Sequence, residues 1–175
     1  AQIFKGYRTN ALADSAMTEE QRAYLADLSA VTFGNTNRQL TDLSTPTAKW
    51  LGKSLILDSK VTLRYVGDLT ACETTDNITL RVRYRDYAGA EQTAVLTEAE
   101  PYGSVDGYYS FDFSGLLAAE LRTVLQAAVY AGDTQISNTL EYSVDTYGNN
   151  KTGTLDTLCR ALMAYSDAAK TFFAK

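Results

Sequence analysis

Apolar and polar residues alternate along much of the chain between residues 49 and 147, with the two-residue period that is typical of β-strands. The clearest case is residues 78–85, where one face carries Ile78, Leu80, Val82 and Tyr84 and the other carries Thr79, Arg81, Arg83 and Arg85. The same alternation marks residues 55–57, 61–65, 92–97, 109–113, 122–130 and 135–145. About seven or eight such strands, joined by turns at 86–90 and 131–134, predict an antiparallel β-sandwich of immunoglobulin-like type.

Helical spacing appears near both ends of the chain. Thr18 and Gln21 form a capping box, and the apolar residues that follow it predict an N-terminal α-helix over 18–29. Thr154 is placed to cap a C-terminal α-helix, whose apolar stripe comprises Leu155, Leu158, Cys159, Leu162, Met163, Ala169, Phe172 and Phe173. We expect Leu158, Leu162 and Phe172 to be buried against the rest of the chain. The predicted fold is therefore mostly β with flanking helices.

The 175-residue chain is long enough for one domain with a substantial core. Residues 34–47 are rich in Asn, Thr and Ser and predict a linker or loop. We therefore divide the chain into an N-terminal helical lead and linker, residues 1–47, packed on the main domain, and a β-sandwich with its C-terminal helix, residues 48–175. Residues 116–121 are expected to form one helical turn between two strands.

The net charge of −5 argues against a nucleic-acid partner, because phosphate binding needs a clustered field of Lys and Arg. Arg81, Arg83 and Arg85 make up a local basic run. Their alternation with apolar residues favours the solvated face of a strand over an anion-binding patch. No apolar run approaches the roughly 18 residues that a membrane span needs.

The chain contains no histidine, which removes Ser–His–Asp and Cys–His nucleophiles and His-ligated zinc. The two cysteines, Cys72 and Cys159, have no metal-binding spacing, and whether they pair with each other stays open. Glycine-rich phosphate loops and a GxSxG motif are also absent from the sequence. We therefore predict no catalytic residue, no metal site and no cofactor.

The aromatic content suggests one kind of binding site. Twelve Tyr and one Trp are many for this length, and flat rings in loops can stack on the faces of sugar rings. The candidates that fall in or beside predicted loops are Trp50, Tyr87, Tyr102 and Tyr108. Against this interpretation, most of the remaining Tyr residues alternate into the core as ordinary strand residues do.

Three segments carry recognisable packing patterns: residues 55–65, residues 138–147 with the pattern NTLxYSVxxY, and residues 158–165 with the pattern LxxALMxY. Together they resemble a module that is repeated in large surface proteins of anaerobic Gram-positive gut bacteria. Residues 1–4 are also similar to residues 169–172, so the chain is expected to begin where the helix of a preceding module ended. Residues Ile3, Phe4 and Tyr7 are then expected to dock on this module.

The resemblance implies a location outside the cell or at the surface of a bacterium, within a longer polypeptide. It implies no chemistry. The expected function is that of a non-catalytic extracellular module, a spacer or protein-interaction domain whose partners are neighbouring domains of the same polypeptide and a protein or glycan ligand. The alternative is a carbohydrate-binding module that uses exposed aromatic residues.

Overall fold

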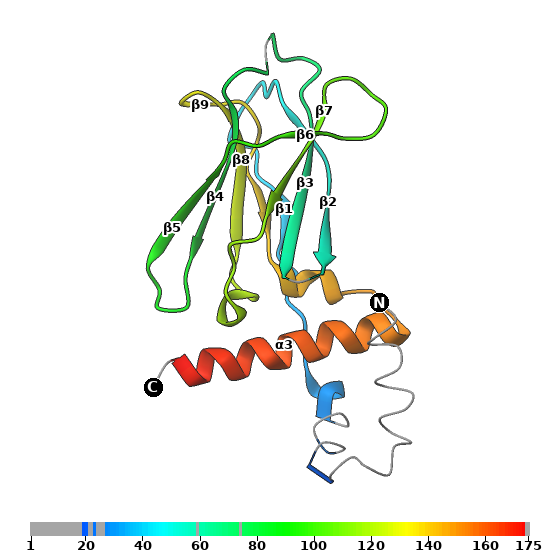
Figure 1. Ribbon diagram of the computed structural model, residues 1–175. Coiled ribbons are helices and arrows are strands. Elements are labelled where there is room, and N and C mark those ends of the chain that lie inside the picture. The colour runs from blue at the N-terminus through cyan, green and yellow to red at the C-terminus, as the bar shows by residue number, and fades with distance from the viewer. Residues whose placement is uncertain (1–18, 21–22, 24–26, 59, 74, 174–175) are drawn as a thin grey trace.

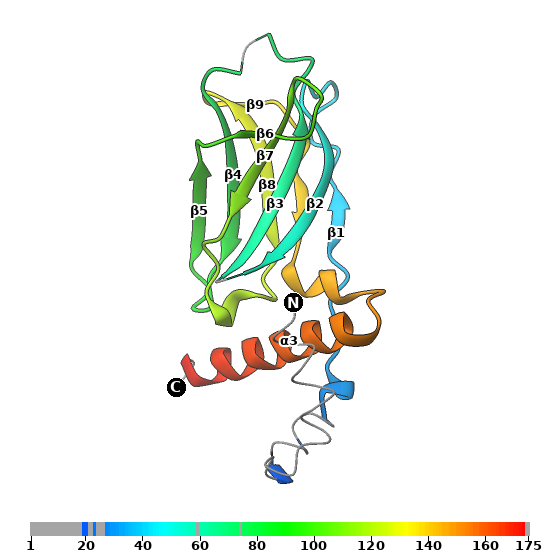
Figure 2. The ribbon, with the colours of Figure 1, turned by 45° about the vertical axis from the view of Figure 1, so that its right-hand side comes forward.

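The computed structural model describes residues 19–20, 23, 27–58, 60–73 and 75–173. Two antiparallel sheets pack face to face, and one long helix lies across one end of them (Figures 1 and 2). The six-stranded sheet has the order β1-β10-β8-β4-β5, with β9 paired to β8; its strands are β1 (Asn37–Gln39), β10 (Leu140–Tyr142), β8 (Leu125–Ala131), β4 (Ile78–Arg85), β5 (Glu91–Leu96) and β9 (Thr134–Gln135). The four-stranded sheet has the order β2 (Lys49–Leu57), β3 (Val61–Asp68), β7 (Tyr108–Phe113) and β6 (Glu100–Pro101). The predicted β-sandwich is confirmed.

The alternation of β4 sets which of its side chains enter the core. Ile78, Leu80 and Val82 are buried, whereas Arg83 and Arg85 are exposed, as the sequence predicts. Across β4, Leu80 is aligned with Val129 of β8 and with Leu96 of β5. A shift of one residue in this register would turn the arginines inward, so the apolar face fixes the pairing.

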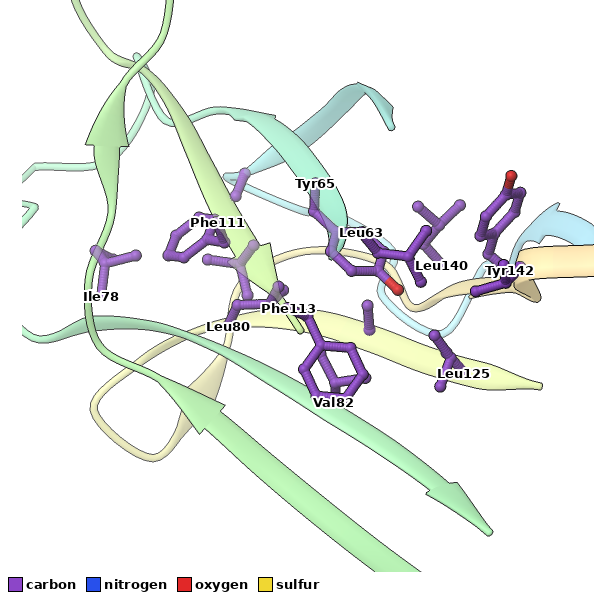
Figure 3. Packing of buried hydrophobic residues seen from close by; sticks show 14 of the residues in the cluster. Leu63, Tyr65, Ile78, Leu80, Val82, Phe111, Phe113, Leu125, Leu140 and Tyr142 are labelled. Carbon is purple, nitrogen blue, oxygen red and sulfur yellow. The ribbon is translucent and has the colours of Figure 1, made fainter. Parts of the chain in front are cut away.

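The core lies between the two sheets. Leu63 and Tyr65 of β3 and Phe111 and Phe113 of β7 face Leu80 and Val82 of β4 and Leu125 of β8 (Figure 3). Each of these large apolar side chains contributes roughly 1.5–3 kcal/mol on burial. The hydroxyl of Tyr65 is buried without a hydrogen-bond partner among the described residues, and burial raises the pKa of this phenol.

The segment 135–145, expected as one strand, is divided into β9 and β10. The backbone N–H groups of Ile136 and Ser137 both donate to the Val129 carbonyl, at 2.8 and 3.4 Å, and Val129 N–H donates instead to Ser137 Oγ at 2.8 Å. Two residues therefore oppose one, which is the arrangement of a β-bulge. After β10 the chain turns into the 3-10 helix η3 (Val144–Gly148) and leaves the sheet.

The C-terminal helix is confirmed as α3 (Gly153–Phe173), and the turn expected at 116–121 is the 3-10 helix η2 (Ala118–Glu120). Both η2 and η3 contact α3. The buried residues of α3 are Cys159, Met163 and Ser166, and Met163 belongs to the main core at 1% exposure. The prediction that Phe172 is buried is wrong, because the last turn of α3 lies beside the β4–β5 turn rather than under the core and leaves Phe172 72% exposed, while Leu158 and Leu162 are half-buried.

Most of the N-terminal helix predicted over 18–29, and all of residues 1–7, lie outside the described residues. The described residues do not show the predicted N-terminal α-helix; at the end of its range they form a 3-10 helix, η1 (Leu28–Ala30), which contacts α3. The stretch 34–47, expected as linker, contains β1, which extends the six-stranded sheet beyond β10. Polar composition concealed this strand because β1 has all three side chains exposed and pairs only through its backbone and Arg38.

Two sets of polar interactions hold this lead to the sandwich. Arg38 Nε donates to Glu141 of β10, and a Glu141 oxygen also accepts a hydrogen bond from Gln126 of β8 at 2.9 Å. Further along, Asp42 accepts bonds from the backbone N–H and the hydroxyl of Thr139, at 2.9 and 2.6 Å, and from Gln135 Nε2 at 2.9 Å. Desolvation alone would raise the pKa of Asp42, but these hydrogen bonds outweigh it and lower the pKa to about 2.

The hydrogen bonds that Asp42 accepts predict a specific dependence of the free energy of unfolding on pH. The pKa of Asp42 falls from 3.8 to about 2 on folding, so its contribution is present above about pH 4 and is lost as pH falls through about 2. We expect wild type to be more stable than Asp42→Asn at pH 6, and the two melting temperatures to converge by about pH 2. A difference that stays constant from pH 6 to pH 2 would contradict this account.

The different burial of two α3 residues predicts a large loss of stability for one substitution and almost none for the other. Met163→Ala empties a filled core position and should lower the free energy of unfolding by about 2–5 kcal/mol. Phe172→Ala should change it by less than about 0.5 kcal/mol, because the ring is solvated. Urea unfolding of both variants measures the two effects, and equal losses would mean that α3 packs differently.

Candidate functional site

The four aromatic residues proposed from the sequence occupy three separate places. Trp50 is half-buried on β2, with its ring 6.0 Å from Tyr65 and its Nε1 donating to the Asn138 carbonyl at 2.7 Å. Tyr102 and Tyr108 flank the β6–β7 loop, where Tyr102 N–H donates to the Tyr108 carbonyl at 2.8 Å. Tyr87 lies in the β4–β5 turn, and its ring centroid is 5.4 Å from that of Phe173 in α3. The structure thus brings Tyr102 and Tyr108 together but does not join all four in one platform.

The arginines of β4 are largely used within the sheet. Arg81 Nη2 binds Asp133 at 2.8 Å and the Gly132 carbonyl at 2.7 Å, and its guanidinium lies 4.2 Å from the Tyr130 ring centroid. Arg85 Nη2 pairs with Glu91 at 2.7 Å, while Arg83 is exposed. Two of the three charges therefore have an acidic neighbour, which favours the solvated-face interpretation of this run.

The cysteines are free thiols, with Cys72 in the β3–β4 loop and Cys159 buried in α3. Burial raises the pKa of both thiols, which keeps them protonated near neutral pH. Among the described residues, no three Cys, Asp or Glu side chains gather in a way that would hold a metal ion. Within the same residues, no helix has the length and apolar character needed to cross a bilayer.

The most exposed aromatic surface lies at the C-terminal end of α3. Phe172 and Phe173 are 72% and 54% exposed, with ring centroids 5.5 Å apart, and Tyr87 adds a third ring beside Phe173. Two helical turns before Phe172 and on the same side, Tyr165 is 60% exposed. We call Tyr87, Tyr165, Phe172 and Phe173 the aromatic end of α3.

Sequence reasoning missed this surface because it treated the stripe of α3 as a single buried face. The stripe is wide enough to have two sides. Residues 159, 163 and 166 form the side that enters the sandwich, whereas residues 155, 158, 162, 165, 169 and 172 follow a three-four spacing on the neighbouring side. The signal was present in this second spacing, but nothing in the sequence says which side the sandwich covers.

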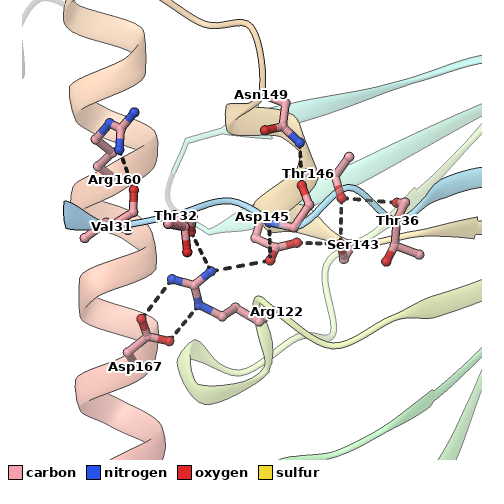
Figure 4. A network of polar contacts seen from close by, with 11 residues as sticks. Val31, Thr32, Thr36, Arg122, Ser143, Asp145, Thr146, Asn149, Arg160 and Asp167 are labelled. Carbon is pink, nitrogen blue, oxygen red and sulfur yellow. Dashed lines mark hydrogen bonds and ion pairs between the residues drawn. The ribbon is translucent and has the colours of Figure 1, made fainter. Parts of the chain in front are cut away.

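A network of polar contacts centred on Arg122 fixes α3 to the sandwich (Figure 4). Arg122 follows η2, and its guanidinium binds both carboxylate oxygens of Asp167 in α3, at 2.7 and 2.8 Å. The same group donates to the Thr32 carbonyl of the lead at 2.9 Å and contacts Asp145 Oδ2 of η3 at 3.4 Å. One side chain therefore connects the N-terminal lead, η3 and α3.

Asp145 is the buried centre of this network. Its Oδ2 accepts the Gly34 backbone N–H at 3.0 Å and its Oδ1 accepts the Ser143 hydroxyl at 2.5 Å. A Cβ atom at Gly34 would lie 2.6 Å from Asp145 Oδ2, so only glycine lets the lead approach this closely. These bonds compensate a carboxylate that would be costly to bury alone.

A second arginine attaches the other side of the lead. Arg160 of α3 pairs with Asp156 one turn earlier, at 3.0 Å, and donates to the carbonyls of Ser29 and Val31. Its guanidinium also lies 5.0 Å from the ring centroid of Phe33. Arg122 and Arg160 together attach α3 to the sandwich and to the lead. They therefore hold the aromatic end of α3 in a fixed position relative to the β4–β5 turn.

The network predicts that Arg122 matters far more than an exposed arginine. Arg122→Gln removes the charge facing buried Asp145 and should cost about 2–4 kcal/mol of unfolding free energy. Arg85→Gln is the matched control, since its pair with Glu91 is exposed and should be worth less than about 0.5 kcal/mol. Denaturant unfolding measures both, and a small, equal loss in the two variants would contradict the structural role of Arg122.

Comparisons with known proteins do not assign a function to this chain. No family model, curated protein or solved structure matches this sequence or fold. The argument for function therefore rests on the surfaces described above.

Proposed function

We propose that the chain is a non-catalytic module of a larger bacterial cell-surface protein, and that it docks on a neighbouring domain of the same polypeptide. The observation that carries this proposal is the aromatic end of α3. Clustered, exposed Phe and Tyr rings are unusual on a surface that faces only water, and such residues are enriched where proteins contact each other.

The rigidity of the support strengthens the proposal. Met163 anchors α3 in the core, and Arg122 and Arg160 attach it to the sandwich and to the lead. Association with another domain then loses little conformational entropy, because the rings are already held on a fixed helix. A spacer needs the same stiffness to transmit orientation from one domain to the next.

The strand order supports an immunoglobulin-like type for the sandwich. In such domains the strands A, B, E and D form one sheet and C, F and G the other. Here β2, β3, β7 and β6 correspond to A, B, E and D, and β4, β8 and β10 correspond to C, F and G, with β5 beside β4 in the position of C′. In this assignment β1 is an additional strand beside G.

Two sequence features support the non-catalytic and extracellular parts of the proposal. The chain has no histidine, so the commonest general base is missing from its chemistry. The resemblance of residues 55–65, 138–147 and 158–165 to a repeated surface module supports a location outside the cell.

Hydrogen exchange in the full-length gene product tests the docking. Backbone amides of residues 86–88 and 165–173 should exchange at least about tenfold more slowly there than in the 175-residue chain alone. The double substitution Phe172→Ser and Phe173→Ser should abolish the difference. Tyr102→Ala, which removes an exposed ring at the other end of the sandwich, should preserve it.

Equal exchange in the two contexts, or equal loss of protection in the Tyr102→Ala control, would rule out docking through α3. A reproducible hydrolase or transferase turnover by the purified chain that survives further purification would separately overturn the non-catalytic part of the proposal.

A further inference from the structure

The end of the sandwich opposite α3 contains a cavity of about 590 Å³. It opens among the β3–β4 loop, the segment between β5 and β6 and the β8–β9 turn, which the views of Figures 1 and 2 place together. Its volume lies within the range of roughly 300–1,000 Å³ that is usual for small-ligand sites. None of the four aromatic residues proposed from the sequence lines it.

The lining has the chemistry of a site for a neutral polar molecule. Leu69, Ile78 and Ala99 supply an apolar part, and the ring of Tyr109 adds an aromatic surface. Thr75 and Thr97 contribute hydroxyls, Asn77 an amide and Asp133 a carboxylate that is paired with Arg81. Among the described residues that line the cavity there is no Lys or Arg, so an anionic ligand would find no charge partner in the lining.

The walls are held in place without a ligand. Asn77 adopts a left-handed backbone conformation with a φ of 59°, and its carbonyl accepts the Gly132 N–H at 3.1 Å, which joins the β3–β4 loop to the β8–β9 turn. Arg81 fixes that turn from outside the cavity through Asp133 and the Gly132 carbonyl. Such a preformed site loses little freedom on binding.

We infer that this cavity binds one neutral sugar ring, either as a free sugar or as the terminal unit of a glycan. An aromatic surface, several hydroxyls and an amide match the alternating apolar faces and hydroxyl edges of a pyranose. The inference is independent of docking through α3, because the two surfaces lie at opposite ends of the sandwich.

A titration of the ¹⁵N-labelled full chain with glucose, galactose and N-acetylglucosamine tests this site. At least one of these sugars should produce saturable shifts at the amides of Leu69, Asn77, Thr97 and Gly132. Glucuronate should bind no more tightly than glucose, because the lining contains no cation and its one carboxylate is paired with Arg81.

Asn77→Gly, which keeps the left-handed conformation available but removes the amide, should weaken binding at least about tenfold. Thr93→Val on β5 is the matched control, since Thr93 is exposed and lies away from the cavity, and it should bind like wild type. Unchanged circular dichroism would show that each variant folds.

A free sugar and an oligosaccharide that ends in it distinguish the two sources. Equal affinity assigns the site to a single ring in either setting, whereas tighter binding of the oligosaccharide assigns it to a glycan end. Absence of saturable shifts with all three neutral sugars would overturn the inference. So would shifts confined to Tyr102 and Tyr108, tighter binding of glucuronate than of glucose, or equal weakening in Thr93→Val.

Discussion

The attachment of α3 to the sandwich depends on the guanidinium of Arg122, which binds α3, η3 and the N-terminal lead at the same time. Each of these segments is weakly specified by itself. Residues 34–47 of the lead are mostly polar, η3 is a single short turn and α3 has two apolar sides. Bidentate pairing with Asp167 gives the helix a defined angle and depth, because a planar guanidinium accepts few orientations of a carboxylate. Burial of Asp145 in turn requires that Arg122, Ser143 and the Gly34 N–H all be present, so the segments become ordered together.

This constraint also decides which surfaces remain for function. Once Met163 occupies the end of the core, the neighbouring side of α3 faces outward and leaves Tyr165 and Phe172 exposed, and Phe173 is exposed at the end of the helix. At the other end, no helix covers the described loops, and a preformed cavity remains between them. The molecule is therefore polarised, with an aromatic docking surface proposed at the helical end and a sugar site inferred at the loop end. A module in a surface protein would benefit from this separation, since attachment to its neighbour would leave the loops free.

Much of the sandwich was predictable from local pattern, and the reasons are visible in particular residues. The strict alternation of residues 78–85 left one orientation for β4, and Gly132 marked the β8–β9 turn. The C-terminal helix followed from its long apolar spacing. Other features depend on partners distant in sequence. The strand β1 forms only because β10 offers a free edge, Arg122 meets partners that lie 23, 45 and 90 residues away, and the cavity collects three loops. The two apolar sides of α3 were readable from the sequence, but choosing between them required the position of the sandwich.

Native-state hydrogen exchange on the wild-type chain tests most directly whether α3 is an integral part of the fold. If the Arg122 network and Met163 make helix and sandwich one cooperative unit, amides of residues 159–166 should open with the same free energy as amides of residues 127–129 in β8, within about 0.5 kcal/mol. Increasing urea below the unfolding transition should then bring both sets onto one line. An opening free energy for α3 that is lower than that of β8 by more than about 2 kcal/mol would show that the helix undocks on its own, and would contradict the account.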